Sequence, residues 1–193
     1  MDITGDAVAE PKPGRALKSA RLLLRPLRVD DLAEMQRYAV DPAFWRWLPL
    51  PPLTAGSVAA FHAAKMAEAD APDRWLWAIE PLDLHRICGT IELRTQDAAN
   101  RAADMGWGLD AAQQGKGYMT EAAALVLRFA LGEAGFERVW AVAAVENEAS
   151  WRVMERIGMR REGTLRRHAD VRGVWRDDHL YAAVRGDALP ARL

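Results

Sequence analysis

The stretch from Met105 to Ala122 constrains the fold of this 193-residue chain more than any other segment. It begins with an apolar run that has glycine at alternate positions, continues through a polar segment that contains Gly115 and Gly117, and ends in apolar residues at helical spacing. This order predicts a strand, a glycine-rich turn and the N-terminus of a helix. Such a turn aims several backbone N–H groups and the positive end of a helix dipole at one point, which suits a phosphate group.

Two common phosphate-binding sequences do not fit this turn. A P-loop would close with Gly-Lys-Ser or Gly-Lys-Thr, and the segment has neither ending. A dinucleotide-binding fingerprint would need a third glycine at the position of Thr120. The two glycines could also serve only to make a tight connection between a strand and a helix, so a ligand does not follow from them alone.

Composition restricts the class of protein. Half of the residues are hydrophobic and 27% are charged, which is ordinary for a globular domain, and the length suits one buried core. The formal net charge of −1 gives no indication of a nucleic acid or an anionic membrane as partner. The single cysteine, Cys88, excludes an internal disulfide, lies in an apolar run and suits a reducing compartment. We therefore expect a cytoplasmic protein without a membrane span, in which Cys88 is an inert core residue.

The remaining patterns predict a flexible leader over residues 1–16 and a single α/β domain over residues 17–193. We expect the first helix to be capped by Asp30 or Asp31, with Glu34 as the capping-box partner of Asp31. Gly132 is a plausible end for the third helix. Strands are expected over residues 21–27, 74–79, 87–94, 101–109, 138–145, 159–168 and 174–184, and helices after Asp31, Thr54, Gly117 and Asn147.

Four segments carry a resemblance to a known family. The run Gln114-Gly115-Lys116-Gly117-Tyr118-Met119 resembles the [QR]-x-x-G-x-[GA] signature of the GNAT acetyltransferases, with Met119 where the family usually has Gly or Ala. The opening run at 21–27, the run from Asn147 to Gly163 and the closing strand around 175–181 are similar to the RimJ/RimL branch, which acetylates ribosomal proteins. The likeness covers roughly residues 17–184.

The resemblance implies the GNAT fold and acetyl-CoA as cosubstrate, without a metal. In that mixed α/β fold a single, mostly antiparallel central sheet has helices on both faces and is splayed between its fourth and fifth strands, here residues 101–109 and 138–145. Acetyl-CoA would enter this gap, with its pyrophosphate on the glycine-rich turn and its pantetheine arm against the fourth strand. The cofactor-binding residues implied are Trp107, Gly108, Leu109, Gln114, Gly115, Lys116, Gly117, Tyr118, Met119, Thr120, Asn147 and Ser150.

The implied reaction is direct transfer of the acetyl group from the thioester to a primary amine. Such an enzyme must hold the amine near the carbonyl, accept its proton, stabilise the oxyanion and protonate the leaving thiolate. The resemblance assigns the oxyanion contact to an N–H near Leu109 and the thiolate's proton to Ser150. The branch often has a glutamate where Ala169 stands here, so the general base is ranked as Asp104 first, Asp170 second and His168 third.

The acceptor site is expected at Trp45 and Trp47, in the proline-rich loop after the first helix. The acceptor could be a protein N-terminus, an amino acid or another small amine, and exposed tryptophans together with the closing hairpin could support a homodimer. Other interpretations stay open, because Asn147 is an N-cap in any case and Ser150 could be a second local cap. For the whole chain, the alternatives are a non-catalytic acyl-CoA-binding module and a structural subunit that assembles through its tryptophans.

Overall fold

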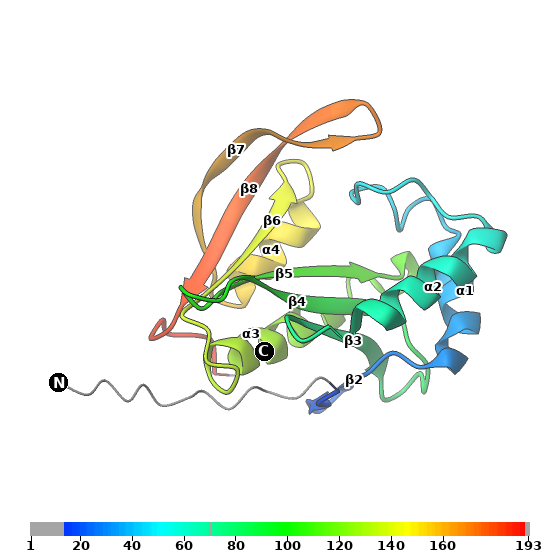
Figure 1. Cartoon of the computed structure of the whole chain (residues 1–193), viewed down its shortest axis with the longest axis horizontal. Coiled ribbons are helices and arrows are strands. Elements are labelled where there is room, and N and C mark those ends of the chain that lie inside the picture. Colours follow the sequence, from blue (N-terminus) through cyan, green and yellow to red (C-terminus); the bar gives the residue numbers. More distant parts are fainter. Residues whose placement is uncertain (1–13, 70, 192–193) are drawn as a thin grey trace.

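The computed structural model describes residues 14–69 and 71–191, and most of the expected leader lies outside them. The described strands form one sheet in the order β1-β2-β3-β4-β5-β6-β8-β7 (Figure 1). All neighbouring strands are antiparallel except β5 and β6, which are parallel. The strands are β1 (Leu17–Lys18), β2 (Leu22–Arg25), β3 (Arg74–Pro81), β4 (Gly89–Asp97), β5 (Ala102–Leu109), β6 (Arg138–Ala144), β7 (Arg160–Val171) and β8 (Val174–Val184).

Helices cover both faces of the sheet. They are α1 (Leu32–Ala39), α2 (Ala55–Ala69), α3 (Tyr118–Leu131) and α4 (Glu148–Arg156), with single 3₁₀ turns at Val29–Asp31 and Ala111–Gln113. Alternate side chains of β3 enter two separate apolar clusters, as the twofold period of a strand requires. Trp75 and Trp77 pack on the side of α3, whereas Leu76 and Ala78 pack on the side of α1 and α2. The expected mixed α/β architecture with helices on both faces is confirmed.

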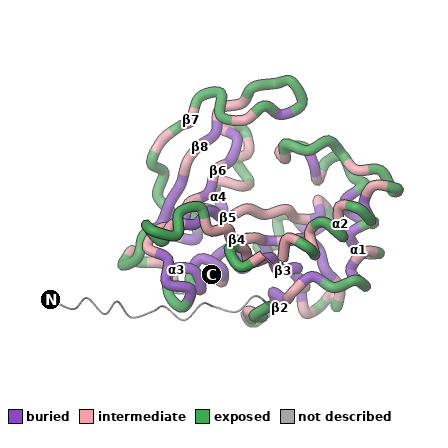
Figure 2. Tube along the Cα trace, viewed as in Figure 1, coloured by how far each residue is buried: buried purple, intermediate pink, exposed green. Residues whose placement is uncertain are grey.

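The strand, turn and helix predicted around the glycine-rich segment are present as β5, the turn and α3. Helix α3 is almost entirely buried, and Phe129 on it meets the rings of Trp75 and Trp77 edge-on, at centroid distances of 6.2 and 5.6 Å. Gly132 ends the helix, as expected. Because α3 lies in the core (Figure 2), the turn at its N-terminus is held in a fixed position. No helix within residues 14–69 and 71–191 is long and apolar enough to cross a membrane.

Asp31 is the N-cap residue of the first helix, α1, as expected, but its side chain makes no capping hydrogen bond. The Asp31 carboxylate does not bond to the N-terminus of α1 but accepts hydrogen bonds from the Arg25 guanidinium at 2.7 and 2.8 Å and from the Arg28 N–H at 2.7 Å. Arg25 also donates to Glu80 at 2.5 Å. Burial alone would raise the pKa of Asp31, but the contacts with Arg25 and Arg28 outweigh burial and hold it below its usual value.

Strands β5 and β6 separate part of the way along their length. They are paired from Ala102↔Arg138 to Asp104↔Trp140. Beyond that point residues 105–109 of β5 are not paired with residues 141–144 of β6. Figure 1 shows the two strands diverging there. Residues 105–109 stay paired with β4, and residues 141–144 stay paired with β8. One edge of each strand therefore lacks a neighbouring strand along this stretch, which confirms the expected splay.

Candidate active site

The turn between β5 and α3 presents unpaired backbone donors. Asp110 accepts a hydrogen bond from the Ala112 N–H at 3.0 Å and so starts the 3₁₀ turn. Gly115 and Gly117 then adopt φ values of 78° and 81°, a region that favours glycine. Within the described part of the chain, the N–H groups of residues 115–117 make no hydrogen bond. They are available to an anionic ligand at the N-terminus of α3.

Side chains around the turn pack behind its backbone. Tyr118, Met119 and Thr120 are buried, so only their N–H groups can face a ligand in the turn. The Met119 side chain packs in the core. It therefore does not fill the turn, although the family usually has a smaller residue at this position. The Lys116 ammonium donates to the Gln113 amide oxygen at 2.7 Å.

Sequence reasoning did not assign Arg21 to this turn. Its guanidinium donates to the Glu121 carboxylate at 2.7 Å and to the Lys116 carbonyl at 3.1 Å, and it lies over the Tyr118 ring at 5.4 Å from the centroid. These contacts fasten the segment before β2 to the start of α3. The only signal in the sequence was the position of Arg21 in a run that resembles the family's opening strand.

The gap between β5 and β6 brings the other predicted cofactor residues to its rims. Trp107, Gly108 and Leu109 are half-buried and lie on β5 beyond its last pair with β6. Gly108 has no space for a side chain, because a Cβ there would lie 2.8 Å from Cζ of Phe44. At this position β5 therefore presents backbone atoms, and no side chain, to a ligand in the gap.

Asn147 and Ser150 lie beyond the end of β6, at the start of α4. The Asn147 side-chain oxygen accepts a hydrogen bond from the Ser150 N–H at 3.4 Å, which confirms the predicted N-cap. The Ser150 hydroxyl is half-buried and makes no hydrogen bond to the described residues. It is therefore free to donate a proton to a ligand that enters the gap.

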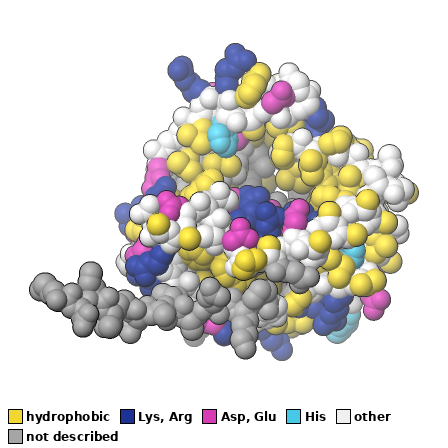
Figure 3. Space-filling model, in the orientation of Figure 1, with side chains coloured by type: hydrophobic (Ala, Val, Ile, Leu, Met, Phe, Trp, Pro, Cys, Tyr) yellow, Lys and Arg dark blue, Asp and Glu magenta, His cyan; other side chains and the backbone are white. Residues whose placement is uncertain are grey.

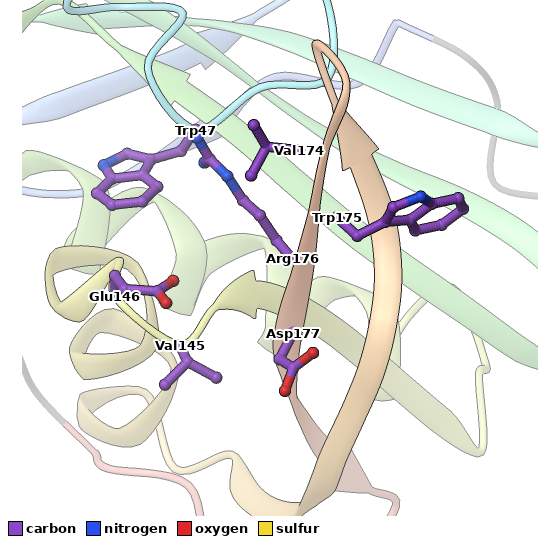
Figure 4. Close-up of a pocket in the computed structure, with 7 residues that line it drawn as sticks. All are labelled: Trp47, Val145, Glu146, Val174, Trp175, Arg176 and Asp177. Atoms are coloured by element: carbon purple, nitrogen blue, oxygen red, sulfur yellow. The ribbon is translucent and has the colours of Figure 1, made fainter.

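A cavity of about 400 Å³ opens at the end of β6 (Figure 4). It brings together three segments: the loop between α1 and α2, the link from β6 to α4, and β8. Its lining mixes apolar surface with groups of both charges. Trp47 is one of the lining residues, and the charged part of the lining was not predicted from the sequence. The residues around the cavity are Trp47, Val145, Glu146, Val174, Trp175, Arg176 and Asp177.

Trp45 does not share this position with Trp47, contrary to expectation. It is 1% exposed, donates its ring N–H to the Ala39 carbonyl at 2.5 Å and meets Phe44 and Phe61 edge-on. Its side chain belongs to the apolar cluster beneath α1 and α2. Trp45 therefore supports the loop from inside and offers no surface to an acceptor.

Asp104 is held by neighbouring side chains and does not fit the role of general base. It is 5% exposed, lies directly opposite Arg94 on β4 and binds both ends of its carboxylate to that guanidinium. Gln96 donates to it at 2.7 Å. Arg94 also pairs with Glu92. Figure 3 shows acidic and basic side chains close together near the centre of the face of the molecule that it draws. Arg94 and Gln96 therefore occupy both carboxylate oxygens of Asp104, and neither oxygen is free to meet an amine.

The other two candidates for the base also have local partners. Asp170 accepts the Gly173 N–H at 2.7 Å and so holds the turn between β7 and β8. His168 lies 2.7 Å from the Asp178 carboxylate through its Nδ1. Neither lines the cavity, but Glu146 and Asp177 do. The Glu146 carboxylate makes no hydrogen bond or ion pair within the described residues.

Two arginines of the β7–β8 hairpin fasten it to the loop that carries Trp47. Arg172, at the tip, donates to the carbonyls of Trp45, Leu50 and Arg46 at 3.1, 3.0 and 3.2 Å. Arg176 donates to the Arg46 carbonyl at 3.3 Å and lies over the Trp47 ring, 5.1 Å from its centroid. The loop and the hairpin therefore form one continuous wall of the cavity.

The chemistry of a metal or a thiol has no support in the described residues. No group of three or more His, Cys, Asp or Glu side chains among residues 14–69 and 71–191 is placed to hold a metal ion. Cys88 is fully buried, and burial, with a smaller effect of Asp110, raises the pKa of its thiol to about 12. A thiol with that pKa is protonated at neutral pH and is a poor nucleophile.

Comparison with known proteins gives a consistent result. Residues 21–160 match the family model described as an acetyltransferase (GNAT) domain. The probable N-acetyltransferase YjcK of Bacillus subtilis (strain 168) is 37% identical over 103 residues, which span 53% of this chain and 57% of that protein. The uncharacterized N-acetyltransferase YnaD of the same strain is 27% identical over 166 residues, which span 86% of this chain and 95% of that protein.

A solved structure shows the same arrangement of elements. Mycobacterium smegmatis RimJ, in complex with CoA-disulfide, superposes with a TM-score of 0.74 and 26% sequence identity over 84% of this chain and 81% of that chain. The family match ends at residue 160, where β7 begins. The hairpin that supplies much of the cavity wall therefore lies outside the matched segment.

Proposed function

Because this chain belongs to the GNAT acetyltransferase family, we propose that it transfers the acetyl group of acetyl-CoA directly to a primary amine. The observation that carries this proposal is the separation of β5 and β6 beyond Asp104↔Trp140, with the unpaired N–H groups of residues 115–117 at the adjoining turn. A pantetheine arm has amide groups that can pair with the free edge of β5, and a pyrophosphate suits the turn. The two sites together fit the two polar parts of CoA.

The proposed chemistry uses groups at the rims of this gap. A backbone N–H near Leu109 stabilises the oxyanion as the amine attacks the thioester carbonyl. The Ser150 hydroxyl, which has no partner among the described residues, protonates the leaving thiolate. Glu146 replaces Asp104, Asp170 and His168 as the candidate acceptor of the amine's proton, because it lines the cavity and its carboxylate forms no ion pair with the described residues. It is exposed, so the proton can pass through water to the solvent.

The branch and the assembly remain proposals. Similarity to Mycobacterium smegmatis RimJ, at 26% sequence identity, supports a RimJ/RimL-like enzyme. Val174 and Trp175 are 60% and 52% exposed on β8, which supports a homodimer formed through the hairpin. A monomer by light scattering at micromolar concentrations would contradict the dimer.

The function is tested by release of free thiol. The full chain is incubated with acetyl-CoA and each member of a panel of primary amines, and the thiol is measured colorimetrically alongside a thermal shift with CoA. An enzyme gives a thermal shift and amine-dependent thiol release, which Ser150→Ala reduces. A thermal shift without thiol release from any amine would indicate a binding module, and no shift would indicate a structural subunit.

A further inference from the structure

Three arginines gather where the loop after α1 meets the β7–β8 hairpin. Arg46, Arg172 and Arg176 make contacts with backbone carbonyls or with the Trp47 ring, and none is paired with a carboxylate of the described residues. Many other arginines of the domain do have such a partner, as Arg94 has in Asp104. These three guanidinium groups are therefore not held in ion pairs within the described residues, and a guanidinium of this kind in a concave site is available to an anion.

Arg176 is the member of this group that lines the cavity. Arg176 is half-buried, and its guanidinium is held by the Trp47 ring and, within the described residues, by one hydrogen bond, from Nη1 to the Arg46 carbonyl. A guanidinium has five N–H donors in a planar fork, and the remaining donors have no acceptor within the described part of the chain. A fork held in this way matches a carboxylate or phosphate group, which accepts two parallel hydrogen bonds. Arg172 differs, because it donates to several carbonyls and serves the loop.

Two carboxylates line the same cavity, those of Glu146 and Asp177. Asp177 accepts the Arg167 N–H at 2.8 Å, whereas the Glu146 carboxylate has no partner within the described residues. Figure 4 shows Arg176 extending toward Trp47, with Val145 and Glu146 beside the end of β6. Glu146 and Arg176 do not form an ion pair, so the cavity holds opposite charges apart. A molecule that carries both an ammonium and an anionic group complements both. The ammonium would lie on the side of β6, where the gap that receives the thioester opens.

From this arrangement we propose that the acceptor is an amine that also carries an anionic group, a carboxylate or a phosphate, which binds the Arg176 fork. The inference rests on the proposed function and narrows its substrate class. It favours a free amino acid or a related amino acid anion over an amine without a negative charge. Arg176 is then a specificity-determining residue, positioned by Trp47.

The test compares pairs of amines in which one member carries an anionic group and the other carries a neutral amide in its place or lacks the group. Suitable pairs are alanine with alaninamide, β-alanine with β-alaninamide, and O-phosphoethanolamine with ethanolamine. Initial rates of thiol release at saturating acetyl-CoA give kcat/KM, which is corrected for the fraction of each amine that is unprotonated at the assay pH. The carboxylate pairs and the phosphate pair are measured separately. The pair with the larger ratio of kcat/KM, anionic to neutral, identifies the preferred anion.

We expect the charged member of at least one pair to have a kcat/KM about ten- to a hundredfold higher than the neutral member, the range of a hydrogen bond to a charged group. Arg176→Gln should bring this ratio of kcat/KM values close to one, mainly through KM, and Arg176→Glu should invert the ratio in favour of the neutral member of each pair. Arg166→Gln is the matched control, because Arg166 is exposed on the same hairpin and its side chain makes no hydrogen bond or ion pair with the described residues. Unchanged thermal shift with CoA shows that each variant is folded.

Equal kcat/KM values for the members of every pair would overturn the inference while leaving the acetyltransferase in place, and so would a preference that Arg176→Gln retains. If no amine releases thiol, the proposed function fails, and binding decides the inference. N-acetylalanine and N-acetylalaninamide are then titrated into the CoA-loaded protein with tryptophan fluorescence as the readout. Tighter binding of the carboxylate by the wild-type chain, lost in Arg176→Gln, supports the anion site, and equal binding rejects it.

Discussion

Replacement of Gly117 separates two demands on the turn before α3, namely an unusual backbone conformation and close approach to a phosphate. Gly117 is the N-cap of α3 and has a φ of 81°. An L-residue in this region costs roughly 1–2 kcal/mol, so Gly117→Ala should lower the free energy of unfolding by about that amount. For a chain of this size, this corresponds to a melting temperature lower by about 2–8 °C.

Gly117→Asn should cost less stability, because asparagine enters the left-handed region more readily than alanine. Both variants nevertheless add a Cβ at 3.4 Å from the Arg21 guanidinium, on the backbone that is proposed to meet the pyrophosphate. If one charged hydrogen bond is lost, the Kd for CoA should rise by about ten- to a hundredfold in both. The affinity loss should therefore not follow the stability loss.

Gly173 provides the matched control. It has a φ of 83°, and a Cβ there meets nothing within 4 Å, but it lies in the β7–β8 turn. Gly173→Ala should destabilise the chain as Gly117→Ala does and leave the Kd for CoA unchanged. Calorimetric titration with CoA and thermal unfolding measure both quantities. A folded Gly117→Asn variant with wild-type affinity for CoA would refute the assignment of this turn to the pyrophosphate.

Three further outcomes follow from contacts at the site and in the core. Ser150→Ala should lower kcat roughly ten- to a thousandfold and leave the Kd for CoA unchanged. Asn147→Ala should instead weaken CoA binding and lower the free energy of unfolding by about 1 kcal/mol through the lost cap. Steady-state kinetics and titration with CoA distinguish the two variants. The lowered pKa of Asp31 adds stability that is fully present above its usual value of 3.8 and is lost as the pH falls through the lowered pKa. The gap in unfolding free energy between wild type and Asp31→Asn should therefore shrink in acid titrations, and a gap independent of pH would contradict the ion pair with Arg25. Cys88, with a pKa of about 12, should resist iodoacetamide in the native chain and react after unfolding, as mass spectrometry would show.

Element order could be predicted because each element leaves a local pattern. The alternation in β3, the helical spacing after Gly117 and the cap at Asn147 each depend on residues close in sequence. Asp31 shows the limit of this reasoning. A helix cap and a buried ion pair use the same residue type at the same place, and only the position of Arg25 on β2 decides between them.

The site was predicted less fully, because its lining depends on which distant segments meet. Trp45 and Trp47 are similar in sequence context, yet one is in the core and the other on the cavity. Asp104 has no evident ion-pair partner in the sequence, because Arg94 is placed opposite it only by the register of β4 and β5. Arg176 and Glu146 carry no motif, and only the tertiary fold brings them to one cavity.

The attachment of the loop after α1 to the hairpin tip has a consequence for attempts to change the acceptor. The loop's carbonyls depend on Arg172 for donors, and Arg172 comes from a segment more than a hundred positions downstream. A chimera that imports only the loop from a related enzyme would therefore separate the backbone from its clamp, and the new wall would lose its shape. Exchange of the loop and the hairpin tip as one cassette preserves this attachment and is the natural unit for redesign.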